Sequence, residues 1–298
     1  MKKIISRISQ RNNQFKQHPI TRSNRIKSLG RYLYFNLVAK VKSQQVFIWM
    51  SDLKFIAQKG DAGMVPNIYF GLHEFPESIF LLHFLRPEDT FLDIGANVGH
   101  YSLLASGIKK SRSIAVEPVP ATFAKLEKQI AINNLQDKIR AINIGVGNNS
   151  GSLHFSTNKG TMNRVVAPGY KNAVMVPVQT IDSLVENEIV SLIKIDVEGY
   201  EKFALEGATA TLENENLRAV IIEINFSNSF YGVENPEIVA IFQSHGFSPF
   251  TYDGTTRTLT ALESYNEEQY NTIFIRDLDF VKDRIAKSEK IKIWNKSF

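Results

Sequence analysis

The sequence predicts an α/β protein with a doubly wound, seven-stranded, mainly parallel sheet and a helical N-terminal extension. From residue 90 onward, short apolar runs alternate with segments of helical periodicity, as in sheets covered by helices on both faces. The first apolar run ends in the glycine-containing turn Gly-Ala-Asn-Val-Gly. The last two apolar runs form a hairpin-like pair. We therefore expect right-handed parallel crossovers and one antiparallel edge.

The expected elements follow the chain in order. The first βα unit has a strand at 90–94 and a helix at 100–108. The second has a strand at 113–117, which stops at Pro118, and a helix at 120–133. The remaining strands are expected at 139–144, 153–156, 174–178, 192–196, 218–224, 247–252 and 270–275. The remaining helices are expected at 198–214 and 236–245.

Length and composition favour one main domain with a smaller appended unit. The chain has 298 residues, of which 43% are hydrophobic, enough for one sizeable core. We expect a basic, helical extension over 1–65, a catalytic domain over 66–280 and a basic tail over 281–298. The absence of cysteine excludes disulfides, thiolate metal sites and cysteine nucleophiles, so catalysis would use oxygen or nitrogen groups.

Charge is distributed unevenly along the chain. Residues 1–60 hold 13 Lys and Arg and one acid, a net +12, and the remaining 22 basic and 29 acidic residues give −7. Such a segment fits an anionic partner, either membrane lipid, acidic polysaccharide or nucleic acid, and equally fits a solvated helical face. Interleaved aromatic residues favour an amphipathic helix on the main domain or on a bilayer. No RNA-binding signature is found, so nucleic acid is not expected as a partner.

The N-terminal sequence predicts a cytoplasmic protein. Residues 1–10 lack an apolar run of signal-peptide length, and four charged residues interrupt the apolar stretch 32–57. We expect no transmembrane helix. This pattern allows one kind of membrane association, a peripheral contact between residues 1–60 and an anionic inner membrane surface.

Two acids follow the first two strands of the predicted sheet. Asp93 stands beside the turn that contains Gly95, Asn97 and Gly99, where a pyrophosphate would be repelled and a cationic ligand favoured. Glu117 ends the next strand, 24 residues later, where a carboxylate can accept both ribose hydroxyls. S-adenosylmethionine, which has a sulfonium, an ammonium group and a ribose, fits this pair. The alternative is a connecting turn without a ligand.

A second group of charged residues follows the strand at 192–196. Asp196 and Glu198 lie next to the expected crevice, and either can act as a general base or hold a hydroxyl group. Asp196 can instead cap the following helix. Lys194 points to the same face as Asp196 and forms either a salt bridge beneath the site or a contact with substrate.

Several other residues have weaker predicted roles. Asp196, Glu198 and Glu223 form the one oxygen-ligand set that could hold Mg²⁺, and no metal site is predicted from it. His100 follows the glycine turn and could reach the site. Glu201 and Glu206 are expected to face solvent or to pair on their own helix.

Five segments resemble the FkbM family of methyltransferases, in that family's order. They are FLDIGANVGHYSLLAS (91–106), AVEPVPATFAKLEKQIAINN (115–134), VPVQTIDSLV (176–185), LIKIDVEGYEKFALEGA (192–208) and VIIEIN (220–225). The most specific piece is the 194–201 segment, Lys-x-Asp-Val-Glu-Gly-x-Glu. Gly71-Leu72-His73-Glu74 is similar to the family's Gly-x-x-Glu element, although His73 stands where an aromatic residue is common.

The resemblance implies a class I methyltransferase fold, with a seventh, antiparallel strand, and S-adenosylmethionine as cofactor. It implies that Asp93, Gly95, Asn97, Gly99 and Glu117 bind the cofactor. Val146, Gly147 and Asn148 would lie near the adenine. The implied reaction is O-methylation of a hydroxyl on a sugar, glycan precursor or natural product.

Two other function classes remain open on the sequence. A nicotinamide-dependent oxidoreductase would suit the fold, but Asp93 and the 194–199 segment argue against it. A non-catalytic protein that binds membrane or glycan through its basic arm is the third alternative. The sequence indicates neither the acceptor nor the oligomeric state.

Overall fold

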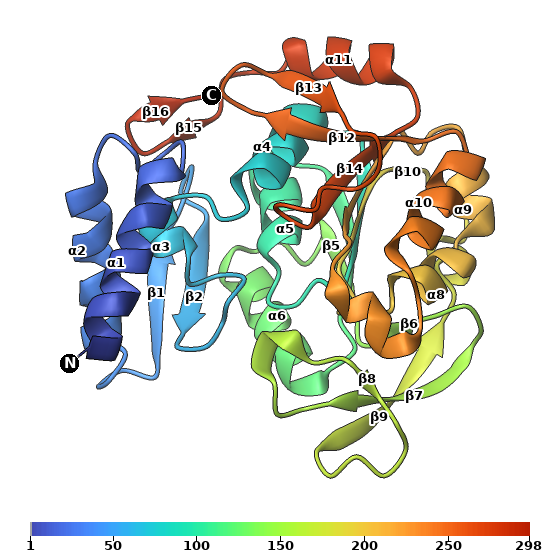
Figure 1. The fold of residues 1–298 in the computed structure, drawn as a ribbon, viewed down its shortest axis with the longest axis horizontal. Helices are drawn as coiled ribbons and strands as arrows, with labels where there is room; N and C mark the ends of the chain where they lie inside the picture. The colour runs from blue at the N-terminus through green and yellow to red at the C-terminus, as the bar shows by residue number, and fades with distance from the viewer. Residues whose placement is uncertain (1) are drawn as a thin grey trace.

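The computed structural model describes residues 2–298 and centres on one eight-stranded sheet, with the strand order β13-β12-β14-β11-β10-β3-β4-β5 (Figure 1). Five neighbouring strands are parallel, and β14, β12 and β13 add three antiparallel pairings at one edge. The doubly wound α/β prediction is confirmed. The seven expected strands of the sheet are extended by β13, a short strand that pairs with β12 after the turn at Gly254.

The bounds of the sheet strands are close to those expected. In chain order they are β3 (Thr90–Ile94), β4 (Arg112–Val116), β5 (Ile139–Ile142), β10 (Val190–Ile195), β11 (Ala219–Glu223), β12 (Ser248–Asp253), β13 (Thr258–Ala261) and β14 (Asn271–Ile275). The chain leaves β3 toward β4 and β5, then returns to place β10 on the other side of β3. This reversal puts a crevice at the carboxyl ends of β3 and β10, where ligands of such sheets bind.

Alternate side chains of the central strands enter two separate cores. Phe91 of β3 and Leu192 of β10 join the core on one face, whereas Leu92 and Ile193 join the core on the other. Helices α3 (Asn67–Phe70), α4 (Phe75–Phe84), α5 (His100–Leu103), α6 (Pro120–Ile132) and α11 (Leu278–Ala286) lie on the first side; the π-helical turn η1 (Leu104–Ile108) follows α5. Helices α7 (Ile181–Val185), α8 (Glu201–Glu206), α9 (Thr209–Glu213) and α10 (Asn235–Ser244) lie on the second.

The single helix expected over 198–214 is two short helices, α8 and α9. Gly207 separates them, and a Cβ atom at Gly207 would come within 2.2 Å of the Gly147 backbone oxygen. The chain therefore bends where another backbone segment approaches it.

A second, four-stranded sheet flanks the carboxyl ends of the parallel strands. It has the order β6-β9-β7-β8 and comprises β6 (Gly145–Val146), β7 (Gly151–Ser156), β8 (Val165–Val166) and β9 (Ala173–Gln179). Two 3₁₀ turns, η2 (Gly160–Met162) and η3 (Phe226–Tyr231), lie in loops near this sheet and after β11. The extended pieces expected at 153–156 and 174–178 belong here rather than to the main sheet.

The N-terminal region contains two helices and a hairpin, α1 (Lys2–Gln17), α2 (Arg25–Val38), β1 (Gln44–Ile48) and β2 (Lys54–Gln58). The hairpin was not predicted, because its aromatic residues suited an amphipathic helix equally well. The C-terminal hairpin of β15 (Lys292–Ile293) and β16 (Lys296–Ser297) lies beside this region, where Trp294 stacks on Arg31 at 3.7 Å (Figure 1). Helix α11 crosses the domain boundary expected at 280, and the division into 1–65, 66–280 and 281–298 stays a prediction.

None of the helices within residues 2–298 is long and apolar enough to cross a membrane.

Candidate functional site

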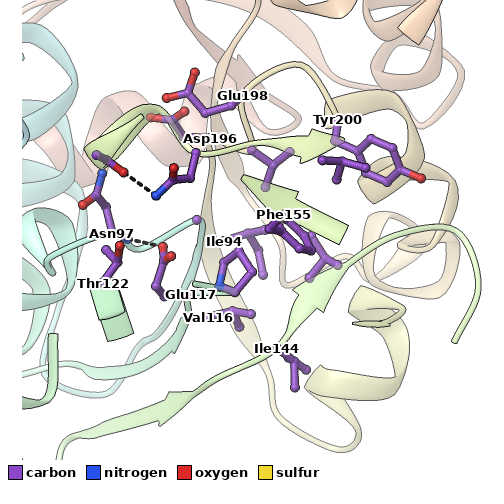
Figure 2. A pocket seen from close by; sticks show the side chains of 17 residues that line it. Ile94, Asn97, Val116, Glu117, Thr122, Ile144, Phe155, Asp196, Glu198 and Tyr200 are labelled. Atoms are coloured by element: carbon purple, nitrogen blue, oxygen red, sulfur yellow. Dashed lines mark hydrogen bonds between the residues drawn. The ribbon is translucent and has the colours of Figure 1, made fainter. Parts of the chain in front are cut away.

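A pocket lies at the carboxyl ends of β3, β4 and β10 and is closed on one side by the second sheet (Figure 2). Its walls combine three carboxyl groups with aliphatic and aromatic side chains. The lining residues are Ile94, Gly95, Asn97, Val116, Glu117, Pro118, Thr122, Ile144, Val146, Phe155, Gly160, Asn163, Val165, Asp196, Val197, Glu198 and Tyr200.

The turn after β3 brings the two halves of the pocket into contact. Gly95 has a φ of +80°, and a Cβ atom there would lie 1.8 Å from the backbone oxygen of Asp196. Only glycine fits this position, because a side chain would push β10 away from β3. Asn97 adopts a φ of +51°, a left-handed conformation that asparagine tolerates better than most residues.

Glu117 is held rigidly at the end of β4. Its Oε2 accepts a hydrogen bond from the Asn97 backbone N–H, and its Oε1 accepts one from the Val119 N–H, both at 3.0 Å. Burial raises the pKa of Glu117 to about 7, although these two N–H groups favour the charged form. Each oxygen keeps one lone-pair direction for a ligand, so the group can accept two further hydrogen bonds.

The wall beside Glu117 is apolar. Val146 of β6, Phe155 of β7 and Val165 of β8 come from the second sheet, and Ile144 precedes β6. In Figure 2 the side chains of Phe155 and Ile94 lie on the same side of the pocket as Val116. The pocket therefore presents a polar anchor and an apolar slot side by side, as sites for small organic ligands do.

Asp196 and Glu198 lie on the loop that follows β10. Glu198 has a φ of +56°, an unfavourable conformation for this residue type and one that is often found at functional sites. Burial and the nearby carboxyl groups of Asp196 and Glu201 raise the pKa of Glu198 to about 8. At neutral pH Glu198 is therefore mainly protonated and can donate a hydrogen bond.

Glu201 supports this loop from within the protein. The expectation that it faces solvent is wrong, since its side chain is 1% exposed. Its Oε1 accepts hydrogen bonds from the backbone N–H groups of Val197 at 3.0 Å and Gly199 at 3.3 Å. Sequence reasoning missed this role because an acid in the first turn of a helix is ordinarily a surface residue. Glu206 does lie at the surface, where it accepts a hydrogen bond from Asn148 at 3.0 Å.

Lys194 lies beneath the pocket and does not line it. Its Nζ is 3.6 Å from Asp196 Oδ2 and donates a hydrogen bond to Asn271 Oδ1 at 3.2 Å, and the residue is 1% exposed. Burial acts to lower the pKa of Lys194, but the surrounding carboxylates of Asp196, Glu74, Glu223 and Asp93 outweigh it and raise that pKa. The ammonium group is therefore a permanent positive charge under an acidic wall.

Two further carboxyl groups belong to this acidic wall, and they come from distant parts of the chain. Glu74 precedes α4, has a φ of +46° and accepts a hydrogen bond from the Tyr101 hydroxyl at 2.6 Å. Glu223 ends β11, where burial and then the charge of Asp196 raise its pKa to about 9. The sequence did contain an indication that Glu74 has a role, because residues 71–74 match the short Gly-x-x-Glu element.

The structure divides the predicted site residues into two groups. Those that line the pocket are Gly95, Asn97, Glu117, Val146, Asp196 and Glu198. Those that do not are Asp93, Gly99, Gly147, Asn148 and Lys194.

Residues of the second group have structural positions instead. The Asp93 carboxylate is 1% exposed and accepts hydrogen bonds from the Ser102 N–H and hydroxyl, at 3.0 and 2.5 Å, so it fastens α5 to β3 rather than facing a cationic ligand. A Cβ at Gly99 would lie 2.7 Å from Leu126, and Gly147 packs near Val178. Asn148 is exposed at the surface.

His100 does not reach the pocket. Its imidazole lies between Asn67, 3.1 Å from Nδ1, and the Ser78 hydroxyl, 2.8 Å from Nε2. Burial lowers its pKa to about 3, so the ring is neutral. Among the described residues, no group of three or more histidine, aspartate or glutamate side chains has an arrangement that could hold a metal ion.

Comparison with protein families places this pocket in a known context. The model of the methyltransferase FkbM domain matches residues 93–249, which are 157 of 298 residues and include the glycine turn, Glu117 and the Asp196 loop. The chain belongs to the FkbM methyltransferase family. The predicted family resemblance is thereby confirmed.

Two curated proteins share parts of this FkbM sequence. The hexuronic acid methyltransferase AglP of Haloferax volcanii is 28% identical over 148 residues, which are 49% of this chain and 59% of AglP. The tRNA(Phe) (4-demethylwyosine(37)-C(7)) aminocarboxypropyltransferase of Pyrococcus horikoshii is 30% identical over 80 residues, 27% of this chain and 29% of that protein. This chain therefore spans less than two thirds of either relative.

Among solved structures, the METTL16 MTase domain is similar to this FkbM chain. The match covers 82% of this chain and 89% of the METTL16 domain, with 13% sequence identity and a TM-score of 0.45. The putative transferase PH0793 of Pyrococcus horikoshii covers 78% of this chain and 70% of its own, with 14% identity and a TM-score of 0.39.

Proposed function

We propose that this protein transfers a methyl group from S-adenosylmethionine to a hydroxyl oxygen of an acceptor that is a sugar, a glycan precursor or a natural product. The observation that carries the proposal is the Glu117 carboxylate, fixed by two backbone N–H groups at the strand end beside an apolar slot. Membership of the FkbM methyltransferase family supports the same reaction class.

The pocket residues fit the adenosine part of this cofactor. Glu117 offers two free lone-pair directions to a vicinal diol such as that of ribose. Val146 and Phe155 supply an apolar surface on which a flat base can lie. Gly95 and Asn97 let the backbone of the turn approach a ligand closely.

The charges of the pocket favour a cationic cofactor over a dinucleotide. None of the described residues that line it is basic, whereas Glu117 and Asp196 can carry negative charge. A pyrophosphate would meet these groups without a compensating cation. This argues against the nicotinamide-dependent oxidoreductase.

Asp196 is the residue that we assign as general base. When bound, S-adenosylmethionine supplies a methyl carbon on a positively charged sulfur, which leaves with the bonding electron pair as the acceptor oxygen bonds to that carbon. The Asp196 carboxylate takes the hydroxyl proton, and the Lys194 ammonium 3.6 Å away holds that carboxylate in place. Protonated Glu198 donates a hydrogen bond that orients the acceptor.

The sugar assignment rests on a relative. AglP is named for methyl transfer to a hexuronic acid, and the region that it shares with this chain covers about half of each protein. A cluster of carboxyl groups next to the pocket suits an acceptor rich in hydroxyl groups, because carboxylates accept hydrogen bonds from adjacent hydroxyls.

Isothermal titration with S-adenosylhomocysteine tests the cofactor assignment. We expect micromolar binding, about −8 kcal/mol. Glu117→Gln should weaken it by about 10- to 100-fold, because charge-assisted hydrogen bonds contribute about 1.5–3 kcal/mol. Asp196→Asn, a matched change on the opposite wall, should leave the affinity within about threefold.

The same variants separate the binding claim from the catalytic one. With an acceptor found by mass-shift screening of neutral and acidic monosaccharides, Asp196→Asn should abolish turnover although cofactor binding persists. Absence of S-adenosylhomocysteine binding by the unchanged protein would remove the cofactor assignment. Unchanged turnover in Asp196→Asn would remove the base assignment alone.

A further inference from the structure

Helix α2 turns an apolar stripe toward solvent, the reverse of an ordinary surface helix. Ile26, Leu33 and Leu37 recur at the spacing of one helix face, and their exposed fractions are 88%, 40% and 63%. On the opposite face, Phe35 is 2% exposed and packs near Phe47, with ring centroids 6.3 Å apart. The helix is therefore anchored by one apolar face and leaves a second uncovered.

The uncovered apolar surface extends beyond the helix. Val41, just after α2, is 88% exposed. Tyr34 lines a common groove with Ile48 of β1, and Val46, two residues earlier on the same face of that strand, is also exposed. We call these seven residues, Ile26, Leu33, Tyr34, Leu37, Val41, Val46 and Ile48, the α2 surface. In Figure 1, α2 lies at the outer edge of the molecule, on the side away from α8–α10.

Basic side chains flank the α2 surface. Arg25, Lys27, Lys40 and Lys42 are exposed on either side of the apolar stripe, and α2 has no acidic residue. Within residues 1–60, Asp52 is the sole acid against 13 basic residues. An uncovered apolar stripe between lysines and arginines has the chemistry of a helix that lies in the interface of an anionic bilayer.

We propose that the α2 surface binds the headgroup region of an anionic lipid bilayer, with its aliphatic side chains inserted between lipids. A second copy of the chain is a poor occupant, because two strongly basic faces would repel each other. A nucleic acid or an acidic polysaccharide could satisfy the charges, but neither offers an apolar phase for Ile26, Leu37 and Val41. This inference is independent of the proposed methyl transfer.

Vesicle sedimentation with the full chain tests the proposal. The probes are vesicles of phosphatidylcholine alone and of equal parts phosphatidylcholine and phosphatidylglycerol, at low and at physiological ionic strength. We expect binding to the anionic vesicles only. The double variant Ile26→Ser/Leu37→Ser, which keeps every charge, should bind at least about tenfold more weakly, since each aliphatic side chain contributes by its buried area.

Two further variants sharpen the test. Lys27→Glu/Lys40→Glu should also reduce binding, and its effect should shrink as salt rises. Met175→Ser removes an apolar residue that is 66% exposed on β9, distant from α2 in Figure 1, and should bind as the unchanged protein does. Thermal unfolding checks that each variant is folded.

Three outcomes would overturn the proposal. The first is equal vesicle binding by the unchanged protein and by Ile26→Ser/Leu37→Ser. The second is retention on heparin or on DNA without any vesicle binding. The third is dimerisation in analytical ultracentrifugation that the double serine variant abolishes, which would identify a second copy as the occupant.

Discussion

The two acidic walls of the pocket are built in different ways. Glu117 is fixed by the backbone of residues at most 20 positions away, through Asn97 and Val119. On the other wall, Asp196 depends on Lys194, and Lys194 in turn contacts Asn271, 77 positions along the chain. The first wall is held by backbone hydrogen bonds from nearby residues, and the second is held by a network of side chains from several elements.

This difference predicts different sensitivities. Backbone N–H groups cannot be removed by most substitutions, so the Glu117 wall should tolerate change around it. The second wall balances several carboxyl groups against one buried ammonium, and a buried charge without its partner is costly.

Gly95→Ala should separate the two walls. Its Cβ would lie 1.8 Å from the Asp196 backbone oxygen, at a φ of +80°. We expect the free energy of unfolding to fall on the order of 5 kcal/mol. Urea denaturation measures it, with Gly151→Ala as control, because nothing lies within 4 Å of a Cβ there. Equal stability of the two variants would show that the walls are not held together at this contact.

Lys194→Met should damage the side-chain wall selectively. It leaves the carboxyl groups of Asp196 and Glu74 without their shared cation, at a cost of about 3–5 kcal/mol in unfolding free energy at pH 8. The loss should shrink at pH 5, where carboxyl groups take up protons. Lys202→Met removes a more exposed ion pair with Glu237 and should cost much less, because solvent screens that pair. Comparable losses in both variants would contradict the network.

Ligand binding at the backbone-held wall should depend on pH near 7. Burial raises the pKa of Glu117 to about 7, and only its ionised form can accept hydrogen bonds with both oxygens. S-adenosylhomocysteine affinity should therefore fall about tenfold between pH 8 and pH 6. Titration calorimetry at both pH values measures this, and Glu117→Gln should show no such dependence. A pH-independent affinity in the unchanged protein would mean that Glu117 does not contact the ligand as a carboxylate.

Glu198→Gln should have the smallest effect, and the size of that effect depends on pH. The folded-state pKa of Glu198, about 8, lies above its ordinary value of 4.5, so the folded protein holds a proton that the unfolded chain releases. Its contribution to stability is therefore lost as pH rises through this window. The glutamine variant should be more stable than the unchanged protein by about 1 kcal/mol at pH 8 and equal to it at pH 4. Thermal melts at both pH values measure this, with Glu206→Gln as the exposed control.

The main sheet could be predicted because its strands are local patterns. The apolar runs at 90–94 and 192–196 are bounded by a glycine turn and by charged residues, and the structure has β3 and β10 there. The break between α8 and α9 could not be predicted, because it results from the approach of Gly147 to Gly207. The β1–β2 hairpin was missed because the packing of Phe47 between Phe35 of α2 and Phe55 of β2 depends on the folded arrangement.

The site shows the same division. Glu117 was identified from its position at a strand end, and the structure places it in the pocket. Asp93 has an equally favourable position in the sequence, but its carboxylate turns to Ser102. Glu201 was expected at the surface, yet it holds the loop of Asp196 and Glu198 from inside. Sequence position indicates where a side chain begins and does not indicate which neighbour it meets.

The α/β fold, the family and the strand ends from which the pocket is built could all be predicted from the sequence. The alternation of strands and helices, the glycine turns and the acidic residues at strand ends are properties of short stretches of sequence. They can be recognised without knowing which segment packs against them in the folded chain. The folded arrangement was needed to show that Lys194 neutralises a wall formed by Glu74 and Asp196, and that α2 leaves Ile26 and Leu37 uncovered. Burial and electrostatic pairing depend on contacts between distant segments, and these contacts exist only in the folded chain.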